Sequence, residues 1–346
     1  MGLTLNLDFP QPKHKNFAMT SLNKNFYFKF LQLIVVSFYL WKTPFLMAQD
    51  SFPSRPITLI VPLSAGSQVD IIARGLAENL SKVSNQPVIV QNREGASSII
   101  GVDAVAKAKP DGYTLGFGPD GAFVIQPNLS TNLPYKSDDF EFICQTNSTM
   151  FLFLVGPQSP FKTVNDLVES ARKSPNKINF GTGGVATSMH LLAESVASEA
   201  NVKFNHVPFK NIGDLSVQTL NGTVDFTVSV PNMLMVNLNK GMRALAISGD
   251  GKVPNLPNIP LLKEMGFKQA GNASMIGLYA PKGMPAETSA WLRNTCQKAV
   301  TSTEFATTSA KTMTAVEFNN ANTYSRSIIQ SQKLNGELIK KINLSN

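Results

Sequence analysis

Ile57-Thr58-Leu59-Ile60-Val61-Pro62-Leu63 runs directly into the turn Ser64-Ala65-Gly66-Ser67-Gln68, and this segment indicates the fold class of the chain. The first seven residues are a nearly continuous apolar run rich in β-branched side chains, which is typical of a strand buried on both faces. After the turn, apolar residues recur at helical spacing from Val69 to Val83. A buried strand that leads through a short turn into a helix indicates an α/β protein with parallel strands.

The same alternation continues along the chain and predicts two lobes. Because 346 residues exceed the size at which a single core stops growing, we expect lobe 1 to hold residues 49–145 and 275–346 and lobe 2 to hold residues 146–274. We predict a mostly parallel sheet flanked by helices in each lobe, with right-handed crossovers. Strands are expected at residues 57–63, 87–90, 113–118, 151–155, 177–180, 204–208, 225–230, 243–247 and 276–280, and helices at 69–83, 99–108, 164–173, 186–199, 213–220, 285–302 and 323–344.

The N-terminus has the pattern of an export signal. Residues 30–41 form a twelve-residue segment with only Gln32 and Ser37 polar, and Lys24 and Lys29 precede it. A helix of that length spans ~18 Å, short of the ~30 Å hydrocarbon core, so a signal peptide fits better than a membrane anchor. We predict a signal over residues 1–48, with Met19 as an alternative start, and a soluble protein exported to the periplasm. A buried hydrophobic helix is the alternative interpretation.

The charge distribution bears on whether the chain binds nucleic acid. The net charge is +8, but half of it lies in the first 48 residues, and no Lys/Arg-rich run with interleaved aromatics follows. We therefore expect no nucleic-acid partner.

Cys144 and Cys296 are the only cysteines. One disulfide is arithmetically possible, but Cys144 ends an apolar strand-like run and Cys296 belongs to a predicted helix, so we expect two buried free thiols.

The sequence contains no convincing motif for a cofactor, a metal or a covalent intermediate. Residues 116–121 match G-x-G-x-x-G and residues 181–186 match G-x-G-x-x-A, but Pro119 interrupts the first and no acidic residue ends the strand after the second. The sequence has no G-x-S-x-G elbow and no H-E-x-x-H spacing for His190 or His206. We therefore expect no cofactor, no metal and no catalytic residue.

The turns after the strands predict a site for an anion. Backbone N–H groups at helix N-termini carry partial positive charge, and ligands of such folds lie outside the carboxyl ends of the strands. Three side chains keep two interpretations each. Asp70 either interacts with the helix dipole or binds a ligand, His190 either packs in the structure or lines the cleft, and Asp225 has either a structural or a cleft-rim role.

Many short segments, in their order and spacing, resemble the extracytoplasmic solute receptors of tripartite tricarboxylate transporters, the Bug or TctC family. The resemblance covers residues 50–342. Its most specific pieces are Phe52-Pro53-Ser54-Arg55-Pro56-Ile57, Val61-Pro62, Asp70 to Arg74, Gln86 to Val90, Asn92-Arg93, Gly95-Ala96, Pro110 to Leu115, Leu133-Pro134-Tyr135, Asp139-Phe140, Phe180-Gly181 to His190, His206 to Lys210, Gly222 to Asp225, Arg243 to Ala246 and Gly277 to Pro281.

This resemblance implies a two-domain periplasmic-binding-protein fold of type II, a Venus flytrap that closes on a small organic acid or amino acid. It also implies membrane permease subunits as partners and a monomeric receptor rather than an enzyme. A receptor that presents its ligand to a sensor kinase, or a periplasmic enzyme, would be the alternatives. The ligand-binding residues carried over from the family are Ser64, Ala65, Gly66, Ser67 and Asp70 on one loop, Thr182, Gly183, Gly184, Thr187 and His190 on the opposing loop, and Asp120 and Asp225 at the far end of the ligand.

Three departures from the family pattern bear on the ligand. The first loop usually reads Ala-Pro-Gly-Gly-Gly-Thr-Asp but holds one glycine here, and the second usually reads Pro-Gly-Ala-Gly-Gly-Asn but is Glu94-Gly95-Ala96-Ser97-Ser98-Ile99. Asp120 replaces a residue that is usually small and polar. An ionised Asp120 beside the ligand would favour an amino group and repel a second carboxylate, so we expect an amino acid or amide-bearing acid more than a citrate-like ligand.

Overall fold

The computed structural model describes residues 52–249, 259–268 and 273–344. The predicted signal peptide over residues 1–48 and the alternative start at Met19 lie outside these ranges. Within them, no helix is both long and apolar enough to cross a bilayer.

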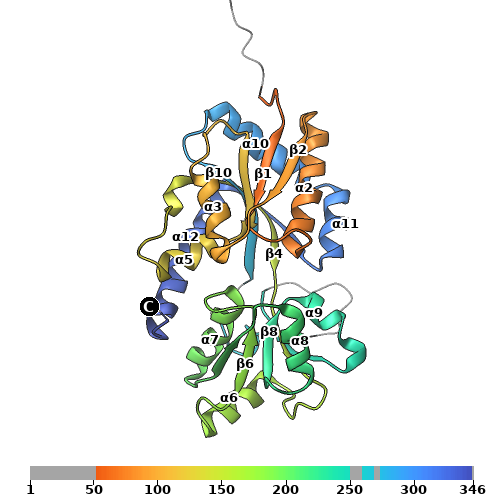
Figure 1. Cartoon of the computed structure of the whole chain (residues 1–346), viewed down its shortest axis with the longest axis vertical. Helices are drawn as coiled ribbons and strands as arrows, with labels where there is room; N and C mark the ends of the chain where they lie inside the picture. The colour runs from red at the N-terminus through yellow and green to blue at the C-terminus, as the bar shows by residue number, and fades with distance from the viewer. Residues whose placement is uncertain (1–51, 250–258, 269–272, 345–346) are drawn as a thin grey trace, which may run out of the picture. The chain divides into compact units, whose positions relative to one another are not determined.

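Strands from both ends of the described chain build the first sheet (Figure 1). Its order is β11-β4-β10-β3-β1-β2. The strand β1 pairs in parallel with β2 and β3, whereas β10 is antiparallel to β3 and β4, and β11 is antiparallel to β4. The bounds are β1 Ile57–Val61, β2 Val88–Asn92, β3 Thr114–Pro119, β4 Phe140–Thr149, β10 Ser274–Pro281 and β11 Ala315–Asn320.

Helices cover both faces of this sheet, and we call the whole assembly the first lobe. Leu59 and Val61 of β1 face a core shared with α2 and α10, while Ile60 faces a core shared with α3 and α12. The prediction of a strand buried on both faces is thereby confirmed. The helices are α2 Gln68–Ser84, α3 Ile99–Ala106, α4 Gly121–Val124, α5 Gln126–Leu129, α10 Ala286–Val300, α11 Thr303–Lys311 and α12 Ala321–Lys341, with 3-10 turns η1 Ala96–Ser98 and η2 Ser137–Asp139.

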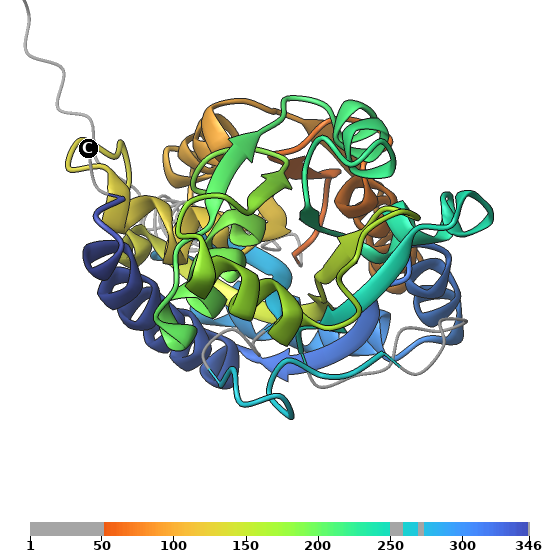
Figure 2. The same ribbon diagram turned by 90° about the horizontal axis from the view of Figure 1, so that it is seen from below.

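The second lobe is built on a five-stranded sheet of order β7-β6-β8-β5-β9. Figure 2 shows this sheet from below, with β9 at one edge. The strand β6 is parallel to β7 and β8, and β5 is antiparallel to β8 and β9. The strands are β5 Leu152–Val155, β6 Asn179–Thr182, β7 Asn205–Pro208, β8 Phe226–Ser229 and β9 Arg243–Ile247, and the helices are α6 Val164–Lys173, α7 Ser188–Ala200, α8 Ile212–Leu220 and α9 Pro231–Met235, with the 3-10 turn η3 Leu238–Lys240.

The α/β class with two lobes agrees with the prediction, but each sheet is mixed rather than mostly parallel. The antiparallel strands enter where the chain passes from one sheet to the other, between β4 and β5 and between β9 and β10. The edge strand β11 has no counterpart in the sequence analysis, because its segment alternates weakly between apolar and polar residues. The predicted lobe boundaries at residues 145 and 275 stay a prediction.

The expectation of two free thiols was wrong, because Cys144 and Cys296 form a disulfide. Their burial was predicted correctly, since both side chains are almost fully buried in the core around β1 and α2. Cys144 lies on β4 and Cys296 on α10, which packs against β4. Residues 152 positions apart are therefore brought together by tertiary packing, which local sequence patterns do not report.

Candidate functional site

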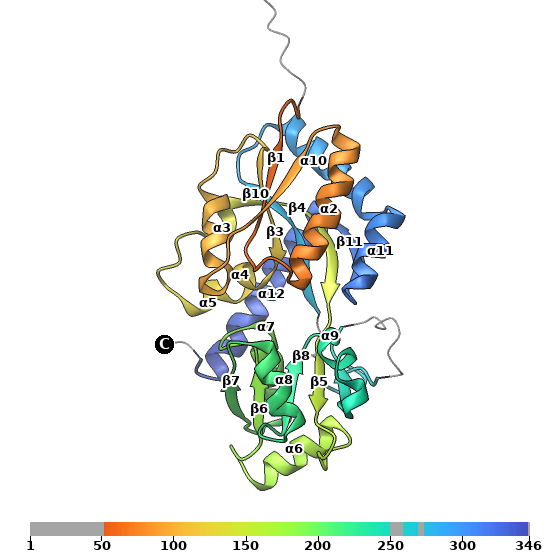
Figure 3. The ribbon, with the colours of Figure 1, turned by 45° about the vertical axis from the view of Figure 1, so that its right-hand side comes forward.

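A cavity of about 640 Å³ opens where turns of both lobes meet. Its volume is in the range of sites that bind small molecules. In the first lobe it is lined by segments that follow β1, β2 and β3, and in the second lobe by segments that follow β6, β7 and β8. Figure 3 shows the elements from which these segments come. Polar lining residues include Ser64, Ser67, Glu94, Ser97 and Thr149 from the first lobe and Thr187, Ser188 and Lys210 from the second.

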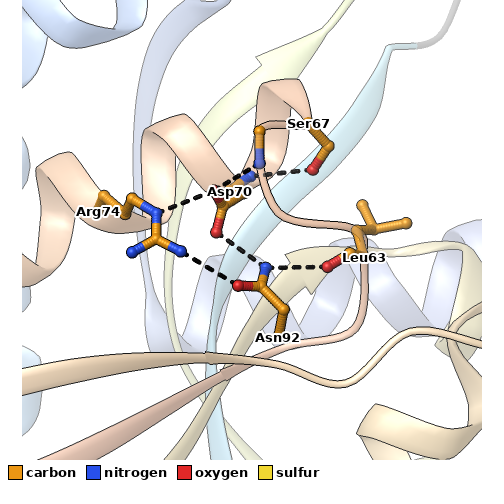
Figure 4. A network of polar contacts seen from close by, with 6 residues as sticks. Leu63, Ser67, Asp70, Arg74 and Asn92 are labelled. Atoms are coloured by element: carbon orange, nitrogen blue, oxygen red, sulfur yellow. Dashed lines mark hydrogen bonds and ion pairs between the residues drawn. The ribbon is translucent and has the colours of Figure 1, made fainter.

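The first turn is held in place by the buried carboxylate of Asp70 (Figure 4). Asp70 Oδ2 accepts hydrogen bonds from the Gly66 amide and from Arg74 Nε, each at 2.9 Å, and Oδ1 accepts one from Asn92 Nδ2 at 2.8 Å. Burial raises the pKa of the Asp70 carboxyl, but these hydrogen bonds and the Arg74 charge outweigh burial and hold its pKa below the ordinary value. Asp70 thus stabilises the turn through its hydrogen bond with the Gly66 amide, and it does not line the cavity.

Ser67 joins this turn to α2. Its hydroxyl caps the helix by accepting a hydrogen bond from the Asp70 amide at 3.3 Å, and the same residue lines the cavity. The hydrogen bond between Ser67 and Asp70 therefore fixes the first turn of α2 at the edge of the cavity.

The turn after β2 has an unusual backbone. Gly95, Ala96, Ser97 and Ser98 have φ values of 129°, 45°, 52° and 78° in succession. Left-handed conformations of non-glycine residues cost of order 1–3 kcal/mol each and cluster at functional sites. Three of these four residues, all except Ala96, line the cavity. The strain therefore lies at the cavity wall, and the Ser64 hydroxyl donates to Glu94 at its start.

The second lobe presents the N-terminus of α7. The Thr187 hydroxyl caps this helix, accepting from the His190 amide at 3.3 Å, and Gly183, Thr187 and Ser188 line the cavity. Thr182 lies behind them, fully buried, with its hydroxyl 2.7 Å from His206 Nε2 and bonded to the Gly184 carbonyl.

The two histidines support this turn rather than line the cavity. His190 Nδ1 accepts the Ala186 amide at 3.0 Å, and the His190 ring stacks on the His206 ring with centroids 3.8 Å apart. Burial, followed by the neighbouring His190, lowers the pKa of His206 to about 4. Of the two interpretations of His190, the packing role matches its position.

Asp120 does not face this cavity. Its side chain is buried, and its Oδ1 accepts from the Ser274 hydroxyl at 2.6 Å while Oδ2 accepts from the Met275 amide at 3.1 Å. It lines a smaller neighbouring cavity of about 110 Å³, which also touches α7 and α12. Burial raises the pKa of Asp120 to about 6, against the lowering effect of these hydrogen bonds.

Asp225 lies at the opposite end of the second sheet. Its carboxylate accepts the Asn179 amide at 2.7 Å, and its own amide donates to the Asn179 carbonyl at 2.9 Å. Both residues are at the starts of the parallel strands β6 and β8, whereas the cavity lies past the strand ends, about 13 Å away at ~3.3 Å per residue. Its position fits the structural interpretation.

The structure thus sorts the predicted residues into three groups. Ser64, Ser67, Gly183 and Thr187 line the cavity, Ala65, Gly66, Asp70, Thr182, Gly184 and His190 belong to the turns behind it, and Asp120 and Asp225 lie elsewhere. Direct contact of any of them with a ligand stays a prediction. Sequence reasoning missed Glu94 and Lys210 as lining residues, although each follows a strand at the same edge as the predicted turns.

The site has the chemistry of a binding site. Hydroxyls, turn amides and two charged groups surround the cavity, and the part of the chain that the structure describes holds no group of three His, Cys, Asp or Glu side chains placed for a metal ion. Such an arrangement can orient a small polar solute by hydrogen bonds and charge.

Comparisons with known proteins agree with this geometry. A family model described as the tripartite tricarboxylate transporter family receptor matches residues 72–344. A "UPF0065 protein in tcbD-tcbE intergenic region" of Pseudomonas sp. (strain P51) is 36% identical over 239 residues, which cover 68% of this chain and 71% of that protein.

Solved structures share the fold. The periplasmic binding protein BugD is 26% identical, with a TM-score of 0.71 over 85% of this chain and 99% of that one. Rpa4515 of R. palustris, solved with adipate, is 25% identical, with a TM-score of 0.73 over 84% of this chain and 97% of that one. The fold is therefore that of the periplasmic binding proteins.

Proposed function

This chain belongs to the tripartite tricarboxylate transporter receptor family, and from that membership we propose that it captures a small carboxylate between its two lobes. The observation that carries the proposal is the shared cavity, to which turns at the strand ends of both lobes contribute. A ligand that touches both lobes favours their closed arrangement, because it binds that arrangement more tightly than the open one. The structure of Rpa4515 with adipate supports a carboxylate as the ligand class.

The carboxylate would be held mainly by uncharged donors and one cation. Candidate donors are turn amides around Gly183, the hydroxyls of Ser67 and Ser188, and the Lys210 ammonium, whereas the Thr187 hydroxyl already donates to the Gly184 carbonyl. Hydrogen bonds to a charged group contribute ~1.5–3 kcal/mol each. Three or four of them, after the costs of association, support a Kd of about micromolar or tighter.

We further propose that the receptor works in the periplasm and delivers its ligand to membrane permease subunits. The predicted signal peptide and the Cys144–Cys296 disulfide both support an exported protein, since disulfides persist in oxidising compartments. The family supports a tripartite transporter as the partner, and we propose that the receptor acts as a monomer without catalysing a reaction.

Calorimetric titration of the purified protein tests the binding proposal. The protein is first unfolded, dialysed and refolded to remove any co-purified ligand, which is identified by mass spectrometry of the unfolded fraction. We expect micromolar or tighter binding of at least one small carboxylate, and weaker binding after Ser188→Ala, which removes a lining hydroxyl without removing the Thr187 cap of α7. Absence of binding by mono-, di- and tricarboxylates and amino acids alike would refute the proposal.

The proposed permease partner is tested by measuring whether the ligand-loaded receptor binds membranes that contain the permease subunits, and whether those membranes take up the ligand. Uptake that requires the receptor supports transport. Ligand-dependent activation of a sensor kinase without uptake would contradict it.

A further inference from the structure

Two charged side chains line the cavity among the described residues, and they come from different lobes. Glu94 follows β2 in the first lobe, and Lys210 follows β7 in the second. Glu94 Oε2 accepts the Ser64 hydroxyl, which leaves Oε1 without a partner in the described part of the chain. The Lys210 ammonium has neither an ion-pair nor a hydrogen-bond partner among those residues. Each charge is thus available to a ligand.

The helix ends around the cavity reinforce this separation of charge. The helix α7 has no acidic residue in its first turn, so the partial positive charge of its N-terminus adds to that of Lys210. The helix α2 has Asp70 in its first turn, and this carboxylate already accepts the Gly66 amide at that end. The cation paired with Asp70 is Arg74, which does not line the cavity. The second lobe presents positive charge to the cavity, and the first lobe presents negative charge.

We infer that the ligand carries an amino or similar cationic group as well as a carboxylate. Glu94 binds the cationic group on the first lobe, while Lys210 and the N-terminus of α7 bind the carboxylate on the second. The inference rests on the proposed function and specifies its ligand class. It also moves to Glu94 the selective role that the sequence analysis gave to Asp120, whose carboxylate faces another cavity and is already bonded to Ser274 and Met275.

This arrangement selects against a plain dicarboxylate. A second carboxylate at the first lobe would meet the like charge of Glu94, whereas an ammonium group there gains a charge-assisted hydrogen bond. The two effects act in the same direction, so the amino-bearing ligand should bind about tenfold or more tightly than its amine-free analogue.

Matched ligand pairs test the inference by calorimetric titration. The probes are L-aspartate with succinate, L-glutamate with glutarate, L-alanine with propionate, and L-phenylalanine with 3-phenylpropionate. The proteins are the wild type, Glu94→Gln, Glu94→Asp and Lys210→Gln. Glu337→Gln and Lys203→Gln serve as controls, because both residues are exposed and lie outside the cavity. Ser64→Ala separates the charge of Glu94 from its hydrogen bond within the turn, and circular dichroism verifies the fold of each variant.

In the wild type we expect the amino-bearing member of the pair that binds best to exceed its partner by about tenfold or more. Glu94→Gln abolishes this ratio because it weakens the amino-bearing member and, where the amine-free member is a dicarboxylate, also relieves the repulsion of that member. Glu94→Asp, Ser64→Ala and both controls retain the ratio. Lys210→Gln weakens both members about equally, because both carry the carboxylate.

Two results overturn the inference alone and leave the proposed function intact. One is equal or tighter binding of the amine-free member by the wild type, and the other is an unchanged ratio in Glu94→Gln. If none of these probes binds the wild type but a tricarboxylate does, the inference fails and the proposed function stands. If the tricarboxylates fail as well, both fail together.

Discussion

Removal of the Cys144–Cys296 disulfide should lower the stability of the first lobe severely. The bond joins β4 to α10, two positions 152 residues apart in the sequence, and the segment between them includes all the strands of the second lobe. Closing a loop of that length restricts the unfolded chain by about 5 kcal/mol at 25 °C in the chain-entropy description. This is comparable with the whole free energy of unfolding of a typical domain, ~5–15 kcal/mol.

Two perturbations separate the cross-link from the side chains. Reduction of the wild type breaks the bond and keeps both sulfur atoms, whereas the double variant Cys144→Ala/Cys296→Ala also removes atoms from a packed core. We expect the reduced wild type to unfold at a lower urea concentration than the oxidised form, and the double variant to unfold at a still lower one, because small cavities add to the cost. Trp291 on α10 is the only tryptophan after residue 48, so its fluorescence reports on the first lobe.

Thiol counting provides the direct control. The chain has two cysteines, so alkylation of the unfolded, unreduced protein should add no label, and alkylation after reduction should add two. Two labels without reduction, in protein prepared from an oxidising compartment, would refute the pairing. An unfolding midpoint that does not move on reduction would refute the stability argument even if the bond exists.

Three further substitutions follow from the packing around the site. Asp70→Ala removes the acceptor of three hydrogen bonds in a buried position but leaves the half-exposed Arg74 in contact with water, so we expect a loss of about 1–3 kcal/mol in urea unfolding together with weaker ligand binding, and Asp70→Asn should be intermediate. Equal stability of Asp70→Ala and the wild type would contradict this role. Because the pKa of His206 falls to about 4 on folding, from 6.5, the unfolded chain binds more protons between those values, and stability should be lost as the pH falls from about 6.5 toward 4. The difference in unfolding free energy between the wild type and His206→Gln, measured from pH 7.5 to 4, should show this loss, and a flat difference would contradict it. Gly101→Ala would place a Cβ 2.6 Å from the Arg93 carbonyl oxygen and 2.8 Å from Pro62 Cβ, and we expect about 1–3 kcal/mol of destabilisation, while Gly121→Ala, with no atom within 3.8 Å of the new Cβ, is the control. Equal unfolding midpoints of these two variants would contradict the predicted clash, because they would mean that the backbone near Pro62 moves aside at no cost in stability.

Much of the architecture was predictable because it depends on local patterns. The apolar run of β1 is buried on both faces, as its composition indicates, and Ser67 caps the helix that the following apolar spacing predicts. The turns around Ser64 and Gly183 follow strands of different sheets, and the strand-end rule predicts only that each turn lies at the ligand-binding edge of its own sheet. That the two turns face one cavity was implied by the family resemblance. The other features need only neighbours along the chain and the geometry common to α/β folds.

Local patterns therefore suffice to predict the α/β class, the alternation of buried strands with capped helices, and the edge of each sheet at which the turns lie. Which side chains line the cavity depends on packing between remote segments. That packing pairs Cys144 with Cys296, places Asp120 at a separate cavity, and places Glu94 and Lys210 at the wall of the main one. Side-chain direction and the distance between remote segments follow from the way two sheets and their helices pack, and no local pattern of residues encodes this.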